Sequence, residues 1–306
     1  MTFAERFLHL PDLFPARRSG HRWGTTDLCI DFAGGPYVFR GLSDRQASIL
    51  RDRYQDLGCI DSHAASVVEI LVFKADAGDF REPEPIPARP YAMDLDFRPA
   101  SVRIAAESLM ALLLLSPLRA GLWTSVEMPT SEVVAVFENF FRLVVAYRLN
   151  QLGGVLLHSA GVVRASRAYL FLGRSGAGKT TISRISRAAG LEVLSDDMNA
   201  VLPSVGGAVV EKLPFAGDLG QTGSRAGGGD LAALFRLEKA AAHNLRPLSE
   251  PEAVALLVSC SPYLNADPHR TDELLHNARR LLRGCTANVL AFRPDPDFWK
   301  LLEDSA

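Results

Sequence analysis

The amino-acid sequence predicts an α/β protein, more closely an α+β arrangement with mixed sheets, and three observations support this. A short apolar stretch, residues 168–173, leads through a glycine-rich loop into a predicted helix. A long helix with a broad apolar face is predicted over Ser131–Leu152. Several short apolar segments bounded by glycine or proline are typical of strands. Helices and strands in this mixture pack as layers around shared cores.

The length and composition suit two modest domains. The chain has 306 residues, of which 48% are hydrophobic and 22% are charged, and this balance is ordinary for a protein with a well-formed core. We place a boundary near residue 128. Residues 1–128 are predicted to form a smaller N-terminal α+β domain, and residues 129–306 a domain built around the glycine-rich loop.

Composition also excludes several classes of partner. The net charge of −2 gives no basic field that would attract nucleic acid. The first residues do not form a signal peptide, and the longest apolar run, Leu109–Leu115, is far shorter than the ~20 residues that cross a bilayer. Four scattered cysteines without a C-x-x-C pair suggest neither a zinc site nor a disulfide framework. We therefore expect a reduced, cytoplasmic protein without membrane contact, and a homo-oligomer is compatible with the sequence.

The N-terminal part is predicted to alternate strands with one helix. The proline-rich stretch 81–90 cannot be a helix or a central strand and is read as an extended connector. Leu109–Leu115 fits a buried strand or a helix equally well. The remaining predictions are strands over Thr26–Phe32, Tyr37–Leu42, Ser66–Lys74, Tyr91–Phe97 and Val102–Ala106, and a helix over Ser43–Leu57.

The C-terminal part is predicted to continue this alternation after Gly153 and Gly154 end the long helix. Residues 217–230 contain six glycines and are expected to form a surface loop. A capping box, Ser249 to Glu252, begins a helix that runs to about Ser259. The other predictions are a hairpin of Val155–Leu157 with Gly161–Val163, strands over Ala168–Gly173, Leu191–Leu194, Ala232–Leu237 and Ala287–Phe292, and helices over Thr180–Ala189 and Thr271–Arg283.

Residues 173–180, GRSGAGKT, match the phosphate-binding loop pattern G-x-x-x-x-G-K-[ST]. Small residues let successive backbone N–H groups point at phosphate oxygens, and the helix that follows adds positive charge at its first turn. Lys179 would reach the β- and γ-phosphates, and Thr180 would ligate Mg²⁺. The predicted cofactors are therefore ATP and Mg²⁺. The predicted nucleotide-contacting residues are Gly173, Arg174, Ser175, Gly176, Ala177, Gly178, Lys179, Thr180 and Thr181.

Two adjacent carboxylates, Asp196 and Asp197, follow the loop after one predicted helix and one predicted strand. The strand that ends in them is expected beside the strand that precedes the loop, which would bring both acids near the γ-phosphate. One carboxylate can support the metal while the other accepts the proton of an attacking hydroxyl. The alternative is an aspartate pair that only caps a turn.

The order His158, GRSGAGKT, Asp196-Asp197 resembles the HPr kinase/phosphorylase family, whose catalytic domain is similar to phosphoenolpyruvate carboxykinase. The run Leu213–Ala253 also looks like the divergent HPr kinase-related proteins of bacterial gene clusters, and the resemblance covers about residues 150–255. It implies that Asp196 is the base that activates a seryl hydroxyl, that Asp197 supports the metal, and that His158 lies beside the base. Lys179 and Thr180 would bind phosphate and Mg²⁺.

The chain departs from that family at several positions. Arg174 replaces the usual acidic residue after the first loop glycine, Thr180 replaces a serine, and Ser159 replaces the glycine after the histidine. The family's later signature, associated with phosphorylase activity, has no match. The resemblance implies a kinase whose acceptor is a serine of an HPr-like protein or a ribosomal peptide precursor, and it leaves the reverse, phosphorylase reaction open.

Other interpretations stay open at this point. The chain could be a nucleotide-binding adaptor that transfers no phosphate, or a kinase of a small molecule such as free serine or a carboxylic acid. His158 could be a core histidine, and Arg174 could simply face solvent. Asp218 could approach the metal or sit in a turn, and Arg225 could clamp phosphate or be solvated. The polar group His243, Asn244 and Arg246 is read as surface.

Overall fold

The chain forms two compact units, Met1–Val144 and Val145–Ala306. The computed structural model describes residues 22–59, 67–75, 80, 93–106, 108–125, 130–215, 217–220 and 227–303. The division between the units falls inside helix α4 (Thr130–Gln151), whereas the sequence placed the boundary near residue 128 and the whole helix in the second domain. The N-terminal part of α4 belongs with the first unit because its aromatic side chains pack there.

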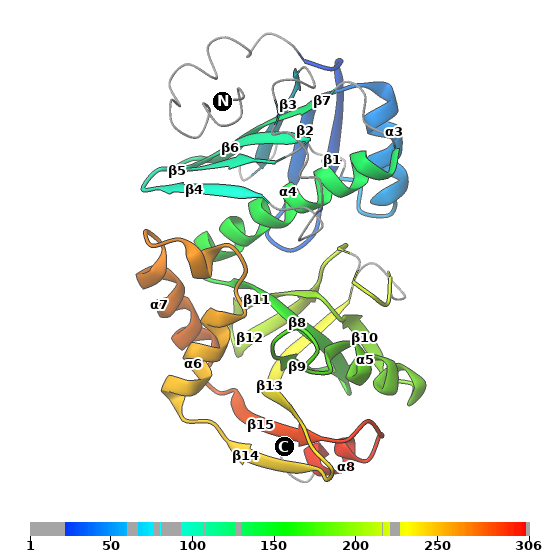
Figure 1. The fold of residues 1–306 in the computed structure, drawn as a ribbon, viewed down its shortest axis with the longest axis vertical. Helices are drawn as coiled ribbons and strands as arrows, with labels where there is room; N and C mark the ends of the chain where they lie inside the picture. Colours follow the sequence, from blue (N-terminus) through cyan, green and yellow to red (C-terminus); the bar gives the residue numbers. More distant parts are fainter. Residues whose placement is uncertain are drawn as a thin grey trace. The chain divides into compact units, whose positions relative to one another are not determined.

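Each unit is organised around one mixed sheet, and the described residues contain six α-helices, so the expected mixed α/β architecture is confirmed (Figure 1). In the first unit the strand order is β1-β2-β3-β7-β6-β5-β4. The pairs β2–β3 and β3–β7 are parallel and the others antiparallel. The strands are β1 Thr26–Ile30, β2 Tyr37–Leu42, β3 Val68–Ala75, β4 Asp94–Arg98, β5 Ser101–Ala105, β6 Leu109–Leu115 and β7 Leu118–Ser125.

The first unit resolves one ambiguity of the sequence and adds one strand. Leu109–Leu115 is a strand, β6, whose neighbour β7 was not predicted. Helix α3 (Asp44–Arg53) begins at a capping box in which the Ser43 and Gln46 side chains each accept the other residue's backbone N–H. The connector predicted at 81–90 lies outside the described residues.

The core of the first unit gathers around Phe141 of α4. Its ring lies 5.0 Å from that of Tyr37, 5.1 Å from Phe39 and 5.9 Å from Tyr54, in each case edge to face. Such pairs contribute roughly 0.5–1.5 kcal/mol beyond the burial of their area. The N-terminal part of α4 is therefore held by the first sheet and by the chain around α3.

The expectation that the cysteines form no disulfide is wrong for Cys29 and Cys59, which are bonded to each other. After α3 the chain returns along the end of β1, where Asp31 N donates to Leu57 O at 2.7 Å and Gly58 bridges Ile30. This return brings the two Cα atoms to 5.3 Å across a sequence separation of 30 residues. No spacing pattern in the sequence marks a pair formed by such a return of the chain.

The second unit is built on an eight-stranded mixed sheet. Its order is β10-β8-β11-β12-β13-β15-β14, and β9 pairs with both β8 and β13. The pairs β8–β11, β11–β12, β12–β13, β13–β9 and β9–β8 thus close a ring. The strands are β8 Val155–Arg164, β9 Arg167–Leu172, β10 Glu192–Ser195, β11 Met198–Ser204, β12 Gly207–Lys212, β13 Gly228–Lys239, β14 Asn244–Pro247 and β15 Thr286–Phe292.

Three predictions for this sheet need correction. The predicted hairpin over residues 155–163 is one continuous strand, β8, which forms its hairpin with β9 instead. Strand β10 does not lie beside β9, because β8 takes the place between them and pairs antiparallel with both. Residues 228–230 of the predicted glycine loop begin β13, while residues 221–226 are outside the described part. The strands β11, β12 and β14 were not predicted.

The helices of the second unit are α5 Lys179–Ala188, α6 Glu250–Ser259, α7 Thr271–Leu281 and α8 Phe298–Glu303, with a short 3-10 helix, η3, at Leu264–Ala266. The capping box predicted at Ser249 and Glu252 is present at the start of α6. Helix α8, which was not predicted, packs Phe298 and Trp299 on Phe171 of β9, with ring centroids 6.2 and 5.9 Å apart. This packing fixes the strand that leads into the glycine-rich loop.

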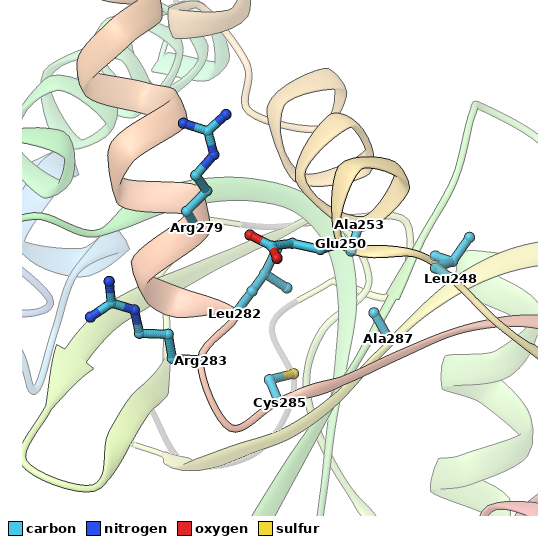
Figure 2. Close-up of a pocket in the computed structure, with 8 residues that line it drawn as sticks. All are labelled: Leu248, Glu250, Ala253, Arg279, Leu282, Arg283, Cys285 and Ala287. Atoms are coloured by element: carbon cyan, nitrogen blue, oxygen red, sulfur yellow. The ribbon is translucent and has the colours of Figure 1, made fainter.

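The polar group predicted at the surface is only partly exposed. Asn244 and Arg246 lie on β14 and are exposed, but His243 is half-buried and lies 2.8 Å from Asp295 Oδ1. Helices α6 and α7 with β15 also border a pocket, drawn in Figure 2. None of the helices in the described part of the chain combines the length and the hydropathy that a membrane-spanning segment requires.

Candidate functional site

The glycine-rich loop joins the end of β9 to the start of α5, in the order that the sequence predicts. Gly178 precedes the helix with φ +113°, a conformation that favours glycine. A Cβ at this position would come within 2.6 Å of the Phe292 ring. Glycine therefore lets the loop lie against β15 and leaves the first N–H groups of α5 available to an anion.

Lys179 lies inside the curve of the loop. Its side chain is buried, with 7% of the residue exposed, and Nζ donates to the carbonyl oxygen of Gly173 at 3.0 Å. Burial lowers the pKa of the Lys179 ammonium, while the Cys260 thiol, Asp197 and Asp196 act in the opposite direction. The Lys179 ammonium group is thus held where phosphates would contact the loop, and it is close to the carboxylates of Asp196 and Asp197.

The other loop residues differ in exposure. Arg174, Ser175 and Gly176 are exposed, while Gly173, Ala177, Gly178, Thr180 and Thr181 are half-buried. Ala177 N donates to Arg174 O at 3.0 Å, a turn that closes the loop. The Arg174 side chain therefore faces away from the protein interior, where a bound nucleotide or acceptor, or solvent, could contact it.

Asp196 and Asp197 occupy the tight turn between β10 and β11. The hydroxyl of Ser195 accepts the backbone N–H groups of Asp197 at 3.0 Å and Met198 at 3.1 Å, which stabilises the turn. Ser159 N donates to Asp197 O at 2.9 Å and ties the turn to β8. Asp196 is buried and Asp197 is half-buried, so the two carboxylates point into different environments.

One oxygen of the Asp196 carboxylate, Oδ2, is buried and has no hydrogen-bond partner among the residues that the structure describes. The other oxygen, Oδ1, accepts Leu219 N at 3.4 Å. Gly217 allows this approach, because a Cβ there would overlap Asp196 Oδ1 and lie 2.8 Å from Asp197 Cβ. A buried carboxylate oxygen left unsatisfied is costly for the fold and is typical of a functional position.

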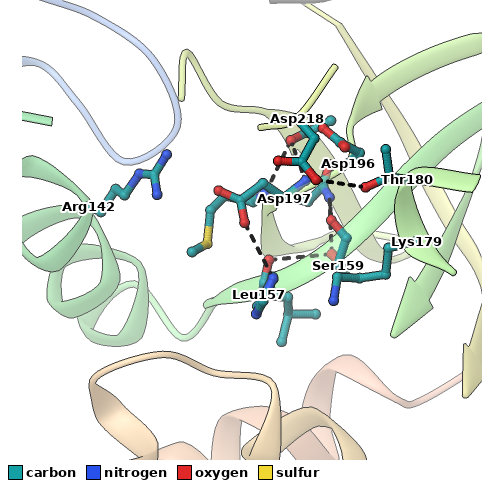
Figure 3. Close-up of polar contacts among 12 residues, drawn as sticks. Arg142, Leu157, Ser159, Lys179, Thr180, Asp196, Asp197 and Asp218 are labelled. Carbon is teal, nitrogen blue, oxygen red and sulfur yellow. Dashed lines mark hydrogen bonds and ion pairs between the residues drawn. The ribbon is translucent and has the colours of Figure 1, made fainter. Parts of the chain in front are cut away.

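The turn over residues 217–220 also brings Asp218 to the loop. Gly220 N donates to Gly217 O at 3.0 Å, and the exposed Asp218 carboxylate accepts the Thr180 hydroxyl, with 3.5 Å between Oγ1 and Oδ2 (Figure 3). The sequence left open whether Asp218 is a turn residue or a metal neighbour. It lies in a turn that places its carboxylate at Thr180.

His158 contacts the second carboxylate, Asp197. Its Nε2 lies 3.4 Å from Asp197 Oδ1, whereas the resemblance implied a position beside Asp196. The reason is the register of β8 with β11, which pairs His158 with Met198 and directs it to the Asp197 side of the turn. Backbone contacts fix this position, since His158 N donates to Cys260 O at 2.8 Å.

Cys260, at the end of α6, is a neighbour of the loop that the sequence did not suggest. Burial raises the pKa of its thiol, and a hydrogen bond from the Gly173 backbone and the charge of Lys179 act in the opposite direction. Nothing in the sequence links residue 260 to residues 173–179, because the contact arises from the packing of α6. Arg225, the other candidate clamp, lies outside the described residues.

ATP and Mg²⁺ fit this set of residues. Mg²⁺ is usually bound by one or two carboxylates together with substrate phosphates, and Thr180, Asp197 and Asp218 offer such oxygens (Figure 3). In the described part of the chain no group of three or more His, Cys, Asp or Glu side chains is arranged to hold a metal ion. Phosphate oxygens of a nucleotide would be further ligands for a metal beside these side chains.

Comparisons with known proteins leave the family of this chain undecided. No protein-family model matches it, and no curated protein matches it. The case for its function therefore rests on the loop, the two carboxylates and their neighbours.

Proposed function

We propose that the protein is an ATP-dependent kinase that transfers the γ-phosphoryl group to a serine hydroxyl of a protein or peptide. The observation that carries the proposal is the buried oxygen Oδ2 of Asp196, which has no hydrogen-bond partner in the described part of the chain. It accompanies a glycine-rich loop in which Lys179 Nζ donates to Gly173 O. Phosphoryl transfer needs both elements, cations for the phosphates and a base for the attacking hydroxyl. The family resemblance to HPr kinase and its carboxykinase-like fold belongs to the same proposal.

Each residue has a role in this proposal. Lys179 and the N–H groups at the start of α5 bind the β- and γ-phosphates. Asp196 accepts the proton of the seryl hydroxyl as the phosphoryl group transfers in line. Thr180 and Asp197 would hold Mg²⁺, together with Asp218, whose Oδ2 lies 3.5 Å from Thr180 Oγ1. The Mg²⁺ ion would neutralise phosphate charge.

His158 would act through Asp197. Its Nε2 lies 3.4 Å from Asp197 Oδ1, so it can orient that carboxylate. We therefore assign His158 a positioning role.

The test uses the full chain with Mg²⁺ and γ-labelled ATP. Acceptors would be HPr, peptides encoded beside its gene, and free serine, and the variants would be Lys179→Ala and Asp196→Asn. Asp230→Asn is a matched control, because Asp230 is exposed and pairs with Arg167 at the end of β9 opposite to the loop. We expect labelling by wild type and the control, loss of ATP binding in Lys179→Ala, and a ~10²–10⁴-fold slower transfer in Asp196→Asn.

Three results would oppose the proposal. Wild-type protein that fails to bind Mg²⁺–ATP would remove its basis. Tight binding with no transfer to any acceptor, and no hydrolysis of ATP by water, would support a nucleotide-binding adaptor. Labelling of free serine alone would show a small-molecule kinase.

A further inference from the structure

Helices α6 and α7 and strand β15 border a groove that the proposed phosphoryl transfer does not use. One part is a pocket of about 470 Å³, which is within the range of small-ligand sites. Figure 2 shows its charged side chains, Glu250, Arg279 and Arg283, toward one side and Leu248 and Ala287 toward the other. Its lining is completed by Ala253, Leu282 and Cys285.

The second part continues the groove along α6. It has a volume of about 760 Å³, shares Glu250 and Arg279 with the first pocket, and extends to Ser259. Its lining is mainly apolar and comes from one side of α6 and from α7: Pro251, Val254, Ala255, Val258 and Leu275. The two pockets thus adjoin at Glu250 and Arg279, with a mainly apolar lining along α6 and the charged side chains where α6 begins.

Two arginines at this end are available for a ligand. Arg279 lies in the last turn of α7 and Arg283 just after it, and both are exposed. Within the described ranges neither guanidinium makes a hydrogen bond or an ion pair with another residue. Their position at a helix C-terminus is favourable by itself. That effect does not explain why both line one pocket together with Leu248 and Leu282.

The charge balance selects the kind of anion. Arg279 and Arg283 carry two positive charges, and Glu250 carries one negative charge, so the three side chains have a net charge of +1. A single carboxylate balances this charge, whereas a phosphate dianion would leave a net negative charge beside Glu250. Guanidinium groups bind carboxylates through paired hydrogen bonds, and the apolar lining requires that the carboxylate be joined to apolar groups.

We infer that this groove binds a short apolar peptide segment along α6, with its terminal carboxylate against Arg279 and Arg283. An extended peptide spans at most about 3.5 Å per residue, and ten residues of helix span ~15 Å, so four or five peptide residues cover α6. Helix α6 ends at Cys260, beside Gly173 and Lys179. That this peptide is the phosphoryl acceptor rests on the proposed function, whereas its binding does not.

The test measures binding without nucleotide, so a failure of the kinase proposal would not affect its result. A fluorescein-labelled peptide, Ala-Leu-Val-Ala-Leu with a free carboxylate, would be titrated with the full chain and followed by anisotropy. The same peptide with a C-terminal amide is the matched control. We expect the carboxylate peptide to bind about tenfold more tightly than the amide, because charge-assisted hydrogen bonds are lost in the amide.

Variants then separate the groove from other surfaces. Arg279→Gln and Arg283→Gln should each weaken binding of the carboxylate peptide about threefold to tenfold and reduce its advantage over the amide. Ala255→Glu, at an exposed position of α6, should weaken both peptides by placing a charge in the apolar part. Arg184→Gln, at an exposed arginine of α5, should change neither affinity.

Three results would overturn the inference. These are equal affinities for the carboxylate and amide peptides, no effect of the two groove arginines, and no saturable binding of either peptide up to millimolar protein. Thermal unfolding of every variant would be measured alongside, and unchanged midpoints would show that a loss of affinity is not a loss of fold.

Discussion

The Thr180 hydroxyl donates a hydrogen bond to the carboxylate of Asp218, 38 residues further along the chain, with 3.5 Å between the two oxygens. Thr180 is the second residue of α5, directly after the glycine-rich loop, and Asp218 lies in the turn whose Leu219 N–H donates to Asp196. The loop is thus linked to an acidic turn from a distant part of the sequence. This contact is the reason to include Asp218 among the residues that would hold Mg²⁺.

We predict that Asp218→Asn weakens binding of Mg²⁺–ATP by about tenfold and leaves binding of ATP in EDTA unchanged. Loss of one carboxylate beside the metal lowers the affinity of the site for Mg²⁺, but it leaves the contacts between ATP and the glycine-rich loop unchanged. Isothermal titration with and without Mg²⁺ measures both, with Asp230→Asn as the control. An equal loss of affinity in EDTA would mean that Asp218 acts on the loop and not through a metal.

A second prediction concerns the hydrogen bond from Tyr147 Oη to Asp267 Oδ2, which is 2.6 Å long and buried. Burial, and then the bond to Asp267, raises the pKa of the Tyr147 hydroxyl. Tyr147→Phe leaves a buried carboxylate oxygen without this donor and should lower the free energy of unfolding by ~1–3 kcal/mol. Urea unfolding measures the change.

Tyr169→Phe is the matched control for that experiment. Tyr169 is also buried, but its hydroxyl makes no hydrogen bond within the described part of the chain. Its removal should therefore change stability by less than ~0.5 kcal/mol. Similar losses in both variants would show that the Tyr147 hydroxyl has no special contribution.

The capping box of α6 predicts a pH dependence. Hydrogen bonds from the Ser249 backbone N–H and hydroxyl lower the pKa of Glu252 from its usual 4.5. A lowered pKa in the folded state contributes stability that is present above the usual pKa and is lost as the pH falls through the lowered value. Glu252→Gln should therefore reduce the loss of stability between about pH 5 and pH 2.

Urea midpoints measured across that range would show the difference between wild type and Glu252→Gln. Glu250→Gln is the control, since Glu250 lies in the same first turn without this pair of hydrogen bonds. If Glu250→Gln changes the loss of stability at low pH as much as Glu252→Gln does, the effect comes from negative charge near the helix start and not from the capping box.

The fourth prediction counts thiols. Alkylation of the denatured, unreduced chain should modify only Cys260 and Cys285, and reduction should raise the count from two to four, because Cys29 and Cys59 are bonded. Mass spectrometry gives the count. In the folded protein Cys285 should react slowly at pH 8, since burial raises the pKa of its thiol to about 12.

Reduction should also lower the stability of the first unit. A cross-link over about 30 residues is expected to contribute roughly 3–4 kcal/mol through the entropy of the unfolded chain. Cys29→Ser should abolish the effect of reductant on the unfolding midpoint, and Cys285→Ser should leave that effect intact. Four modified thiols before reduction would contradict the pairing.

Several elements could be predicted because their causes are local. The loop 173–180 follows a strand and precedes a helix as expected, since glycine freedom and apolar periodicity act over a few residues. The capping box at Ser249 and the strand Tyr37–Leu42 are also where the sequence puts them. Leu109–Leu115 could not be assigned from local sequence, because an all-apolar run suits a strand or a helix until its neighbours in the fold are known.

The sequence by itself determined the mixed α/β class and the residue types of the candidate site: a lysine in a glycine-rich loop and two carboxylates after the next strand. Only the tertiary structure decided that β8 separates β9 from β10, that His158 contacts Asp197, and that Asp218 and Cys260 reach the loop. It also paired Cys29 with Cys59. Strand order and contacts between distant segments depend on which apolar faces pack together. That packing is determined by the complete core and cannot be derived from any short stretch of sequence.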